Sequence, residues 1–215
     1  DSAYGQTVKT DQFDERGKHK TKSFTVSKPP VDSLWKDHLN GKDPALGIVP
    51  INKENKCKWG CIDIDEYPLD HKKIIDKLKL KAIDSTIVFR SKSGGAHIFL
   101  FTKDFIPAVS MREKLKTIAA ALGYSKSEIF PKQDYIRVDR GDTGSFLNLP
   151  YHGGDRTMRF AYDEKAEALK LHDFFNVHKE KALSLEDLKN LTIANDKEGN
   201  DYFKGMPPCL VTLLG

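Results

Sequence analysis

The stretch KWGCIDIDEYP at residues 58–68 constrains the fold most, because its apolar and acidic residues alternate. Alternation with a period of two predicts a β-strand with one buried face. Ile62 and Ile64 then lie on one face of a sheet, and Asp63 and Asp65 lie together on the other. The chain is therefore expected to contain a sheet with one apolar face and two neighbouring carboxylates on the opposite face.

Short apolar runs and amphipathic segments follow one another along the rest of the chain. Runs rich in β-branched and aromatic residues predict strands at 46–51, 59–65, 85–90, 97–101, 128–130, 135–138, 145–150 and 156–161. Apolar residues at helical spacing predict helices at 31–41, about 70–81, 107–122, 163–177 and 184–191. Because short turns join several strand pairs, we expect an α+β domain with a mostly antiparallel sheet. The second and third helices would cover one sheet face and leave the other face free for a site.

Shifts in composition divide the chain into three segments. Residues 1–30 hold few apolar residues and many Lys, Thr, Ser and Asp, which predicts a flexible or extended N-terminal arm. Residues 31–165 would form the folded core. Residues 166–215 would form a helical tail that could begin a further C-terminal module.

The composition also excludes several classes of protein. The chain of 215 residues is 39% hydrophobic and 31% charged, which is ordinary for a soluble globular domain. No apolar run reaches the roughly 18 residues of a membrane span, and the N-terminus lacks the layout of a secretory signal. Three cysteines without zinc-site or disulfide-scaffold spacing indicate a reducing, cytosolic setting. The net charge of +4 is compatible with a nucleic-acid partner but does not demonstrate one.

Asp63 and Asp65 have a spacing that suits metal binding. Carboxylates two residues apart on a strand have Cα atoms about 7 Å apart, and their oxygens can converge. Such a pair suits two Mg²⁺ or Mn²⁺ ions about 3.5–4 Å apart, the arrangement that supports in-line phosphoryl transfer. Acids on an exposed strand face are common, so the pair alone does not distinguish a metal site from a solvated surface. The alternation turns Glu66 to the opposite face or into the following turn.

The segment RSKSGGAHIFLF at residues 90–101 joins two predicted strands through a loop rich in Ser and Gly. Gly94 and Gly95 permit positive φ and close backbone approach, so their N–H groups could bind phosphate oxygens. The side chains that could donate to the same anion are Ser91, Lys92, Ser93 and His97. An ordinary hairpin with a Ser/Gly turn would show the same pattern.

The segment SEIFPKQDYIRVDRGDTGSFLNLPYHGG at residues 127–154 supplies further polar groups. Glu128 begins a strand and could be a third carboxylate near the metal ions. Lys132 offers charge for a triphosphate, and Gln133 or Asn148 could bind a sugar or a base. The arginines that could contact a nucleic-acid backbone are Arg137, Arg140, Arg156 and Arg159. An irregular loop with surface charges would explain these arginines equally well.

Taken in chain order, the three elements resemble the motifs of the archaeo-eukaryotic primase superfamily, the primase-polymerases. The acidic D-h-D motif of that family corresponds to Asp63-Ile64-Asp65, and its Ser/Gly loop before a strand-opening His corresponds to SKSGGAH. EIFPKQ and LNLPY resemble the third motif of a branch found in phage, plasmid, mobile-element, CRISPR-associated and TOTE conflict-system proteins. GMPPC near the end resembles the segment that follows the catalytic core in this branch.

The resemblance implies a catalytic core with an RRM-like sheet and assigns roles to its residues. Asp63 and Asp65 would bind two Mg²⁺ or Mn²⁺ ions, with Glu128 as the third catalytic acid and Asp134 as its rival. The phosphates of the incoming nucleotide would be held by His97, Ser91, Lys92, Ser93 and Lys132. Gly95 stands where some members of the family have Ser, so the phosphate-binding Ser remains open between Ser91 and Ser93.

The function implied by the resemblance is template-directed nucleotidyl transfer by a DNA primase, a DNA polymerase or an enzyme that is both. Such an enzyme joins a nucleotide to a 3′-hydroxyl and releases pyrophosphate. Its partners would be a DNA template, single-stranded or primed, and a dNTP or NTP, without a membrane. The core would be monomeric and would lie in the cytoplasm of a bacterial or phage-infected cell.

Two other functions remain open from the residues. A metal-dependent nuclease or replication initiator could use the same acids and His97, but the chain lacks the paired His-hydrophobe-His pattern. A non-catalytic nucleic-acid-binding module would bind phosphates through its basic residues. Acids gathered on one strand face argue against that module, because they would repel phosphate unless metal ions intervene.

Overall fold

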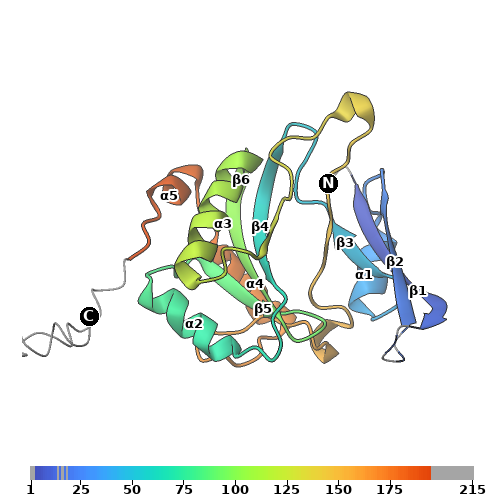
Figure 1. The fold of residues 1–215 in the computed structure, drawn as a ribbon, viewed down its shortest axis with the longest axis horizontal. Helices are drawn as coiled ribbons and strands as arrows, with labels where there is room; N and C mark the ends of the chain where they lie inside the picture. Colours follow the sequence, from blue (N-terminus) through green and yellow to red (C-terminus); the bar gives the residue numbers. More distant parts are fainter. Residues whose placement is uncertain (1–2, 14, 16, 18, 195–215) are drawn as a thin grey trace, which may run out of the picture.

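The computed structural model describes residues 3–13, 15, 17 and 19–194, which form two antiparallel sheets and five α-helices (Figure 1). The first sheet has the strand order β2 (His19–Val26), β1 (Tyr4–Phe13), β3 (Ala45–Ile48) and β8 (Leu147–Asn148). The second has the order β5 (Thr86–Arg90), β6 (Ala96–Pro107), β4 (Lys56–Ile64) and β7 (Glu128–Phe130). The helices are α1 (Asp32–Leu39), α2 (His71–Leu80), α3 (Ala108–Leu122), α4 (Leu171–Lys181) and α5 (Leu185–Asn190). The α+β class predicted from the sequence is confirmed.

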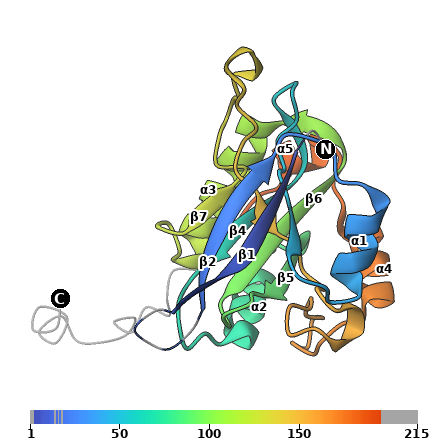
Figure 2. The ribbon, with the colours of Figure 1, turned by 90° about the vertical axis from the view of Figure 1, so that its right-hand side faces the viewer.

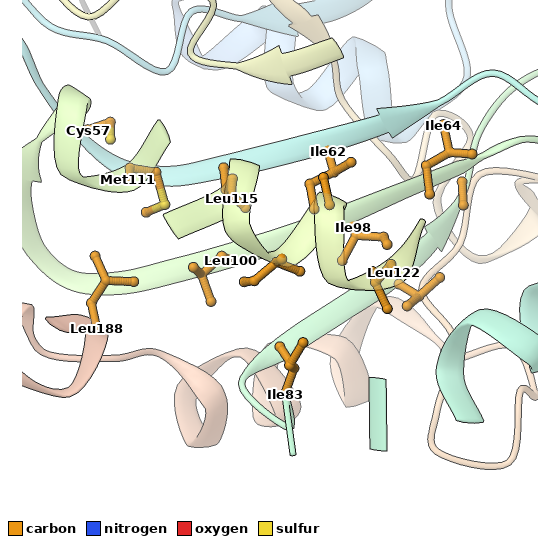
Figure 3. Packing of buried hydrophobic residues seen from close by; sticks show 14 of the residues in the cluster. Cys57, Ile62, Ile64, Ile83, Ile98, Leu100, Met111, Leu115, Leu122 and Leu188 are labelled. Atoms are coloured by element: carbon orange, nitrogen blue, oxygen red, sulfur yellow. The ribbon is translucent and has the colours of Figure 1, made fainter. Parts of the chain in front are cut away.

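The second sheet is anchored by an apolar layer on one of its faces (Figure 3). Ile62 of β4 and Ile98 of β6 are direct cross-strand partners, and both are fully buried. They pack against Met111 and Leu115 of α3 in a cluster that α2 also joins. Burying a large aliphatic side chain contributes about 1.5–3 kcal/mol, so this layer holds the register of β4 firmly. The two helices expected on one sheet face are therefore both there.

The opposite face of this sheet is covered along part of its length. Cys61, Phe89 and Phe99 point to this side and pack with Tyr151 and with Phe174 of α4. The sequence predicted that this face would be free. It is not free, because the chain after β8 returns across the sheet and supplies aromatic side chains to it. The end of the face that carries Asp63 lies beyond this aromatic cover.

The N-terminal segment differs from the arm expected for residues 1–30. Its extended residues form a hairpin, in which Tyr4 of β1 lies opposite Val26 of β2 and opposite Ile48 of β3. Figure 2 shows β1 and β2 in front of the second sheet. The sequence predicted a flexible or extended arm because few residues of this segment are apolar. Backbone pairing with β3 holds it in place, together with the fully buried Ala3 in the apolar cluster.

Several short elements also differ from the sequence prediction. Residues 135–138 form no strand and run into a 3-10 turn at Val138–Arg140. Residues 156–161 form no strand and pair with β5 through an isolated bridge between Ala161 and Phe89. The helix expected at 163–177 begins later, at Leu171. The GMPPC segment lies outside the described residues, and in the described part no helix is long and apolar enough to cross a membrane.

Gly95 fixes the turn between β5 and β6 close to the end of β4. A Cβ atom at this position would lie 2.2 Å from the carbonyl oxygen of Ile64, a contact that no side chain can make. The turn is closed by the Ser91 N–H, which donates to the Gly95 carbonyl at 2.8 Å. Glycine therefore stands here because the loop packs directly on the β4 backbone.

Gly95→Ala is expected to lower the free energy of unfolding by at least about 1 kcal/mol, because the added methyl forces the loop away from β4. Thermal unfolding followed by circular dichroism measures this change. Ser93→Ala, in the same loop but exposed, is the control and should change the stability by less than about 0.5 kcal/mol. An unchanged midpoint for Gly95→Ala would show that the loop is not packed as described.

His38 ties α1 to β3 and to the segment after β8. Its ring is 2% exposed, the Leu46 N–H donates to Nδ1 at 3.1 Å, and Nε2 donates to the Pro150 carbonyl at 2.7 Å. Because Nδ1 accepts, the ring must be neutral with its proton on Nε2. Burial lowers the pKa of His38 to about 4.

The stability of the fold should therefore depend on pH through His38. The contribution of neutral His38 to the free energy of unfolding is complete above the unfolded-state pKa of about 6.5. Up to about 3 kcal/mol of it is lost as the pH falls towards 4. Urea unfolding at pH 7.5 and pH 5 measures the loss. His38→Gln should flatten this dependence, and His172→Gln, at an exposed position, should not. Equal slopes in the two variants would contradict this assignment.

Candidate functional site

Three polar side chains form a row across the second sheet. Asp63 on β4 lies directly opposite His97 on β6 and, on its other side, directly opposite Glu128 on β7. Direct cross-strand partners point to the same face of a sheet. The register of β4, held by the isoleucines of its apolar face, therefore brings these three residues together.

The Asp63 and His97 side chains are close and mostly buried. His97 Nε2 lies 3.1 Å from Asp63 Oδ1, with 14% and 15% of the two side chains exposed. The distance fits an ion pair, but the angles do not fit a hydrogen bond, and Asp63 Oδ1 has no hydrogen-bond donor among the described residues. Hydrogen bonds weaken steeply with misalignment, so this pair is a close electrostatic contact and not a hydrogen bond. A buried carboxylate oxygen thus faces this site without a donor.

Asp65 follows β4 and is held by a tyrosine. The Tyr67 hydroxyl donates to Asp65 Oδ1 at 2.8 Å. Partial burial and this bond to Asp65 raise the pKa of Tyr67, and a contact with the Ser93 hydroxyl acts in the opposite direction. Tyr67 therefore connects the carboxylate of the D-h-D motif with the Ser/Gly loop. The sequence analysis did not single out Tyr67, although its position two residues after Asp65 was visible.

A cavity of about 210 Å³ opens in front of Asp63 and His97, and we call it the His97 cavity. Its lining consists of Asp63, Asp65, Arg90, Ser91, Lys92, Ser93, His97, Leu147, Asn148, Leu149, Pro150 and Arg159. One wall is the Ser/Gly loop between β5 and β6. The opposite wall is β8, which belongs to the other sheet. The cavity thus lies where the two sheets meet.

The His97 cavity gathers unpartnered polar atoms. Among the described residues, four buried side-chain polar atoms lack a hydrogen-bond partner. Three of them, Asp63 Oδ1, Ser91 Oγ and Asn148 Oδ1, belong to residues that line this cavity. Buried polar groups are nearly always hydrogen-bonded, so such a concentration indicates a place for a polar ligand.

Two arginines give the His97 cavity a positive charge beside its carboxylates. Arg159 is half-buried; burial lowers the pKa of its guanidinium and Asp43 acts in the opposite direction, but the group stays charged. Arg90 Nη1 donates to the Ser91 and Met158 carbonyls at 3.3 and 3.2 Å. Lys92 lines the same cavity. The sequence had placed Arg159 with residues that contact a nucleic-acid backbone and had given Arg90 no role.

A second cavity, of about 470 Å³, lies on the other side of the two aspartates, and we call it the Glu128 cavity. It is lined by Asp63, Asp65, Glu66, Gly123, Tyr124, Ser125, Lys126, Ser127 and Glu128. Asp63 and Asp65 therefore form the wall between two cavities of different character. Glu66, which the alternation turned away from the pair, lines this second cavity because β4 ends at Ile64 and the chain then bends.

Other residues of the EIFPKQD segment do not line either cavity. Lys132 Nζ forms an ion pair with Glu128 Oε2 at 2.7 Å and lies over the Phe130 ring. The Gln133 amide donates to the Ser145 hydroxyl at 3.0 Å and closes the loop between them. Asp134 accepts a hydrogen bond from Arg112 of α3 at 2.5 Å. Of the two rival acids, the structure thus places Glu128, and not Asp134, beside Asp63.

The remaining predicted residues separate into two groups. Gly94 and Gly95 lie in the loop as expected, but the Gly94 N–H donates to the Ser91 carbonyl at 3.2 Å. That N–H is used within the loop, in contrast to the expectation that it binds phosphate. Arg137 and Arg140 lie on the exposed loop around the 3-10 turn, and Arg156 lies in a second 3-10 turn at Gly154–Arg156. Among the described residues that line the two cavities, these three arginines do not occur.

The residues of the site are chemically suited to a hard divalent cation. Asp63 presents a buried carboxylate oxygen without a hydrogen-bond donor, and Asp65 lines the His97 cavity beside it. Carboxylate oxygens are the ligands that Mg²⁺ and Mn²⁺ prefer. Within the described part of the chain, no three His, Cys, Asp or Glu side chains are arranged to hold a metal ion by themselves. Mg²⁺ is commonly bound by one or two carboxylates together with substrate phosphates, and the site fits that mode.

Comparison with known protein families identifies the chain. The family model described as "TOTE conflict system, Archaeo-Eukaryotic Primase domain" matches residues 4–187. The match includes the N-terminal hairpin, both sheets, α4 and the first residues of α5. A comparison with curated proteins finds no match. Family membership places the chain in a primase-like nucleotidyltransferase superfamily, whose domains bind nucleotides and nucleic acid. The chain therefore belongs to the archaeo-eukaryotic primase domains of the TOTE conflict-system branch.

Proposed function

We propose that the protein is a template-directed primase-polymerase that adds nucleotides to a 3′-hydroxyl with release of pyrophosphate. One observation carries this proposal: three unpartnered buried oxygen atoms, those of Asp63, Ser91 and Asn148, gather at one cavity that also holds His97 and arginine side chains. A ligand that satisfies the Asp63 and Asn148 oxygens must donate hydrogen bonds or bring a cation, and the basic side chains beside them favour negative charge on the rest of the ligand. A nucleoside triphosphate with its divalent cation has these properties.

The His97 cavity is suited to the triphosphate. Ser91 can donate its hydroxyl proton to a phosphate oxygen, and Arg90, Lys92 and Arg159 can neutralise the phosphate charge. His97 Nε2, which makes no hydrogen bond to Asp63, can donate one to a phosphate oxygen. Asn148 Oδ1 is an acceptor, so it suits a hydroxyl of the sugar or an N–H of the base. These contacts would orient the α-phosphate towards Asp63 and Asp65.

The Glu128 cavity is suited to the attacking strand. It lies on the opposite side of Asp63 and Asp65, so a 3′-hydroxyl there would approach the α-phosphate from the side away from the triphosphate cavity. In-line attack requires such opposite approach of the attacking and leaving oxygens. Ser125, Lys126 and Ser127 line this cavity and can contact the phosphates of the strand end. Repulsion between its acids and the strand would be relieved by divalent cations.

Asp63 and Asp65 would hold the divalent metal ions, with Glu128 as the third acid. When bound, two such ions neutralise charge on the phosphates and favour ionisation of the attacking hydroxyl. The chain itself supplies orientation. Tyr67 fixes one oxygen of Asp65, and the β4 register fixes Asp63 between its cross-strand neighbours. Catalysis by this site would consist of positioning and electrostatic stabilisation, without a covalent enzyme intermediate.

Asp63→Asn should lower nucleotide incorporation by at least about 100-fold, because several kcal/mol of charge stabilisation are lost while the side chain keeps its shape. Extension of a labelled primer on a DNA template, and of an unprimed template, measures this with Mg²⁺ and with Mn²⁺. dNTPs and NTPs are supplied separately. Asp139→Asn, which removes an exposed carboxylate from the 3-10 turn, is the control and should retain activity.

Two outcomes would contradict the proposal. Incorporation by Asp63→Asn equal to that of the control would exclude the assigned metal site. Cleavage of a labelled strand in the presence of metal but without nucleotides, abolished by Asp63→Asn, would show that the same acids serve a nuclease.

Arg159→Met should raise the KM for the nucleotide by about 10-fold to 100-fold, because a charge-assisted hydrogen bond to phosphate contributes about 1.5–3 kcal/mol. Arg156→Met is the matched control, since its side chain lies three residues away on an exposed turn outside the cavity. Steady-state incorporation with varied nucleotide concentration separates KM from kcat. Equal KM values in the two variants would contradict the placement of the triphosphate beside Arg159.

A further inference from the structure

A second basic and aromatic groove lies at the opposite end of β4 from Asp63. Its volume is about 440 Å³, and it is lined by Lys58, Trp59, Phe101, Thr102, Lys103, His178, Lys179 and Ala182. We call it the Trp59 groove. Trp59 and Phe101 are direct cross-strand partners on the same sheet face as Asp63 and His97. Asp63 lies four positions after Trp59 in β4, which corresponds to about 13 Å along the strand.

The aromatic side chains of the Trp59 groove form a continuous series. The Phe99 and Phe101 rings are stacked, with centroids 5.5 Å apart and planes at 7°. Trp59 lies 5.5 Å from Phe99, and the His178 ring meets Phe101 edge-on at 4.6 Å. Phe99 is buried, whereas Trp59 and Phe101 are only half-buried. The series therefore begins in the core and ends with ring surface that a ligand can reach.

The charges around the Trp59 groove are mostly positive. Lys58, Lys103 and Lys179 line it and are exposed, and its lining includes no acidic residue. Carboxylates lie outside the lining: exposed Asp104 and Glu180 follow Lys103 and Lys179 in sequence, and hydrogen bonds from Ser184, followed by attraction to Lys103, lower the pKa of Asp187. Lys58 Nζ also lies 5.2 Å above the exposed Phe105 ring, which extends the same combination of charge and ring beyond the groove. The lining itself therefore presents three lysines beside accessible rings and no carboxylate.

We propose that the Trp59 groove is a binding subsite for single-stranded nucleic acid, separate from the nucleotide site. Unpaired bases stack on aromatic rings irrespective of sequence, and lysines bind the phosphates between them. A paired duplex does not offer its base faces, so single strands are the expected ligand. This subsite rests on the proposed function only in its purpose, which is to hold a template or product strand while Asp63 and Asp65 act.

The groove is tested with the complete chain and oligothymidylate of increasing length. In a Trp35→Phe background, Trp59 is the remaining tryptophan, and base stacking should quench its fluorescence. Lys58→Gln, Lys103→Gln and Lys179→Gln combined should weaken binding at least about 10-fold. They should also reduce the slope of log K against log salt by up to about 2, at about 0.7 per lost phosphate contact.

The control combines Lys73→Gln, Lys116→Gln and Lys165→Gln, which remove the same charge from exposed positions away from the groove. Equal affinity and equal salt slope in the two triple variants would overturn the proposal. Quenching of Trp59 by an acidic peptide but not by oligothymidylate would also overturn it and would indicate a protein partner. Circular dichroism confirms that both variants fold.

The two proposals can fail independently. Asp63→Asn should lose incorporation but keep oligothymidylate binding at the groove. If Asp63→Asn still incorporates nucleotides while the groove variant loses binding, the proposed active site is wrong and the groove stands. If incorporation depends on Asp63 but binding is indifferent to the groove lysines, the groove is wrong and the active site stands.

Discussion

The antiparallel register of β4 with its two neighbours is the constraint on which the rest of the structure depends. The isoleucines of β4 are buried against α2 and α3, so the strand cannot shift by one residue without exposing them. With the register held, Asp63 must stand between His97 and Glu128. The free energy gained by burying the β4 isoleucines thereby keeps Asp63 and Glu128 close together, although the two carboxylates repel each other and each is stabilised by water. The precision of the site comes from packing on the opposite side of the sheet.

Much of the site could be predicted from the sequence because it depends on local periodicity. Alternation alone predicted that Asp63 lies opposite to its isoleucine neighbours, and the loop composition indicated the turn that carries Ser91. The cross-strand row could not be derived in this way, because the pairing of β7 with β4 joins residues more than 60 positions apart. The choice between Glu128 and Asp134 depended on that pairing, and on Arg112 from a helix that sequence reasoning had not connected with Asp134.

The fold was predicted less completely where backbone pairing or sparse contacts decide the structure. The N-terminal hairpin has a polar composition, and its stability comes from hydrogen bonds to β3, which leave little signal in the pattern of side chains. The aromatic cover over the second sheet was missed for a related reason. Tyr151 lies in an irregular segment and Phe174 lies on α4, and the sequence around neither residue indicates the surface on which its ring packs. Arg159 could not be separated from Arg156 without knowing which of the two turned towards the cavity.

The glycines at the centre of the first sheet connect the N-terminal hairpin with the segment that precedes β8. Gly5 of β1 and Gly47 of β3 are register partners, and the Phe146 ring occupies the space where their side chains would be. Phe146 immediately precedes β8, the strand that carries Asn148. A chain shortened to begin at residue 31 would lose one side of this slot and the partner strand of β3. The boundary that composition suggests at residue 30 is thus a poor place to divide the protein, since the first strand helps to shape a cavity wall formed more than 140 residues later.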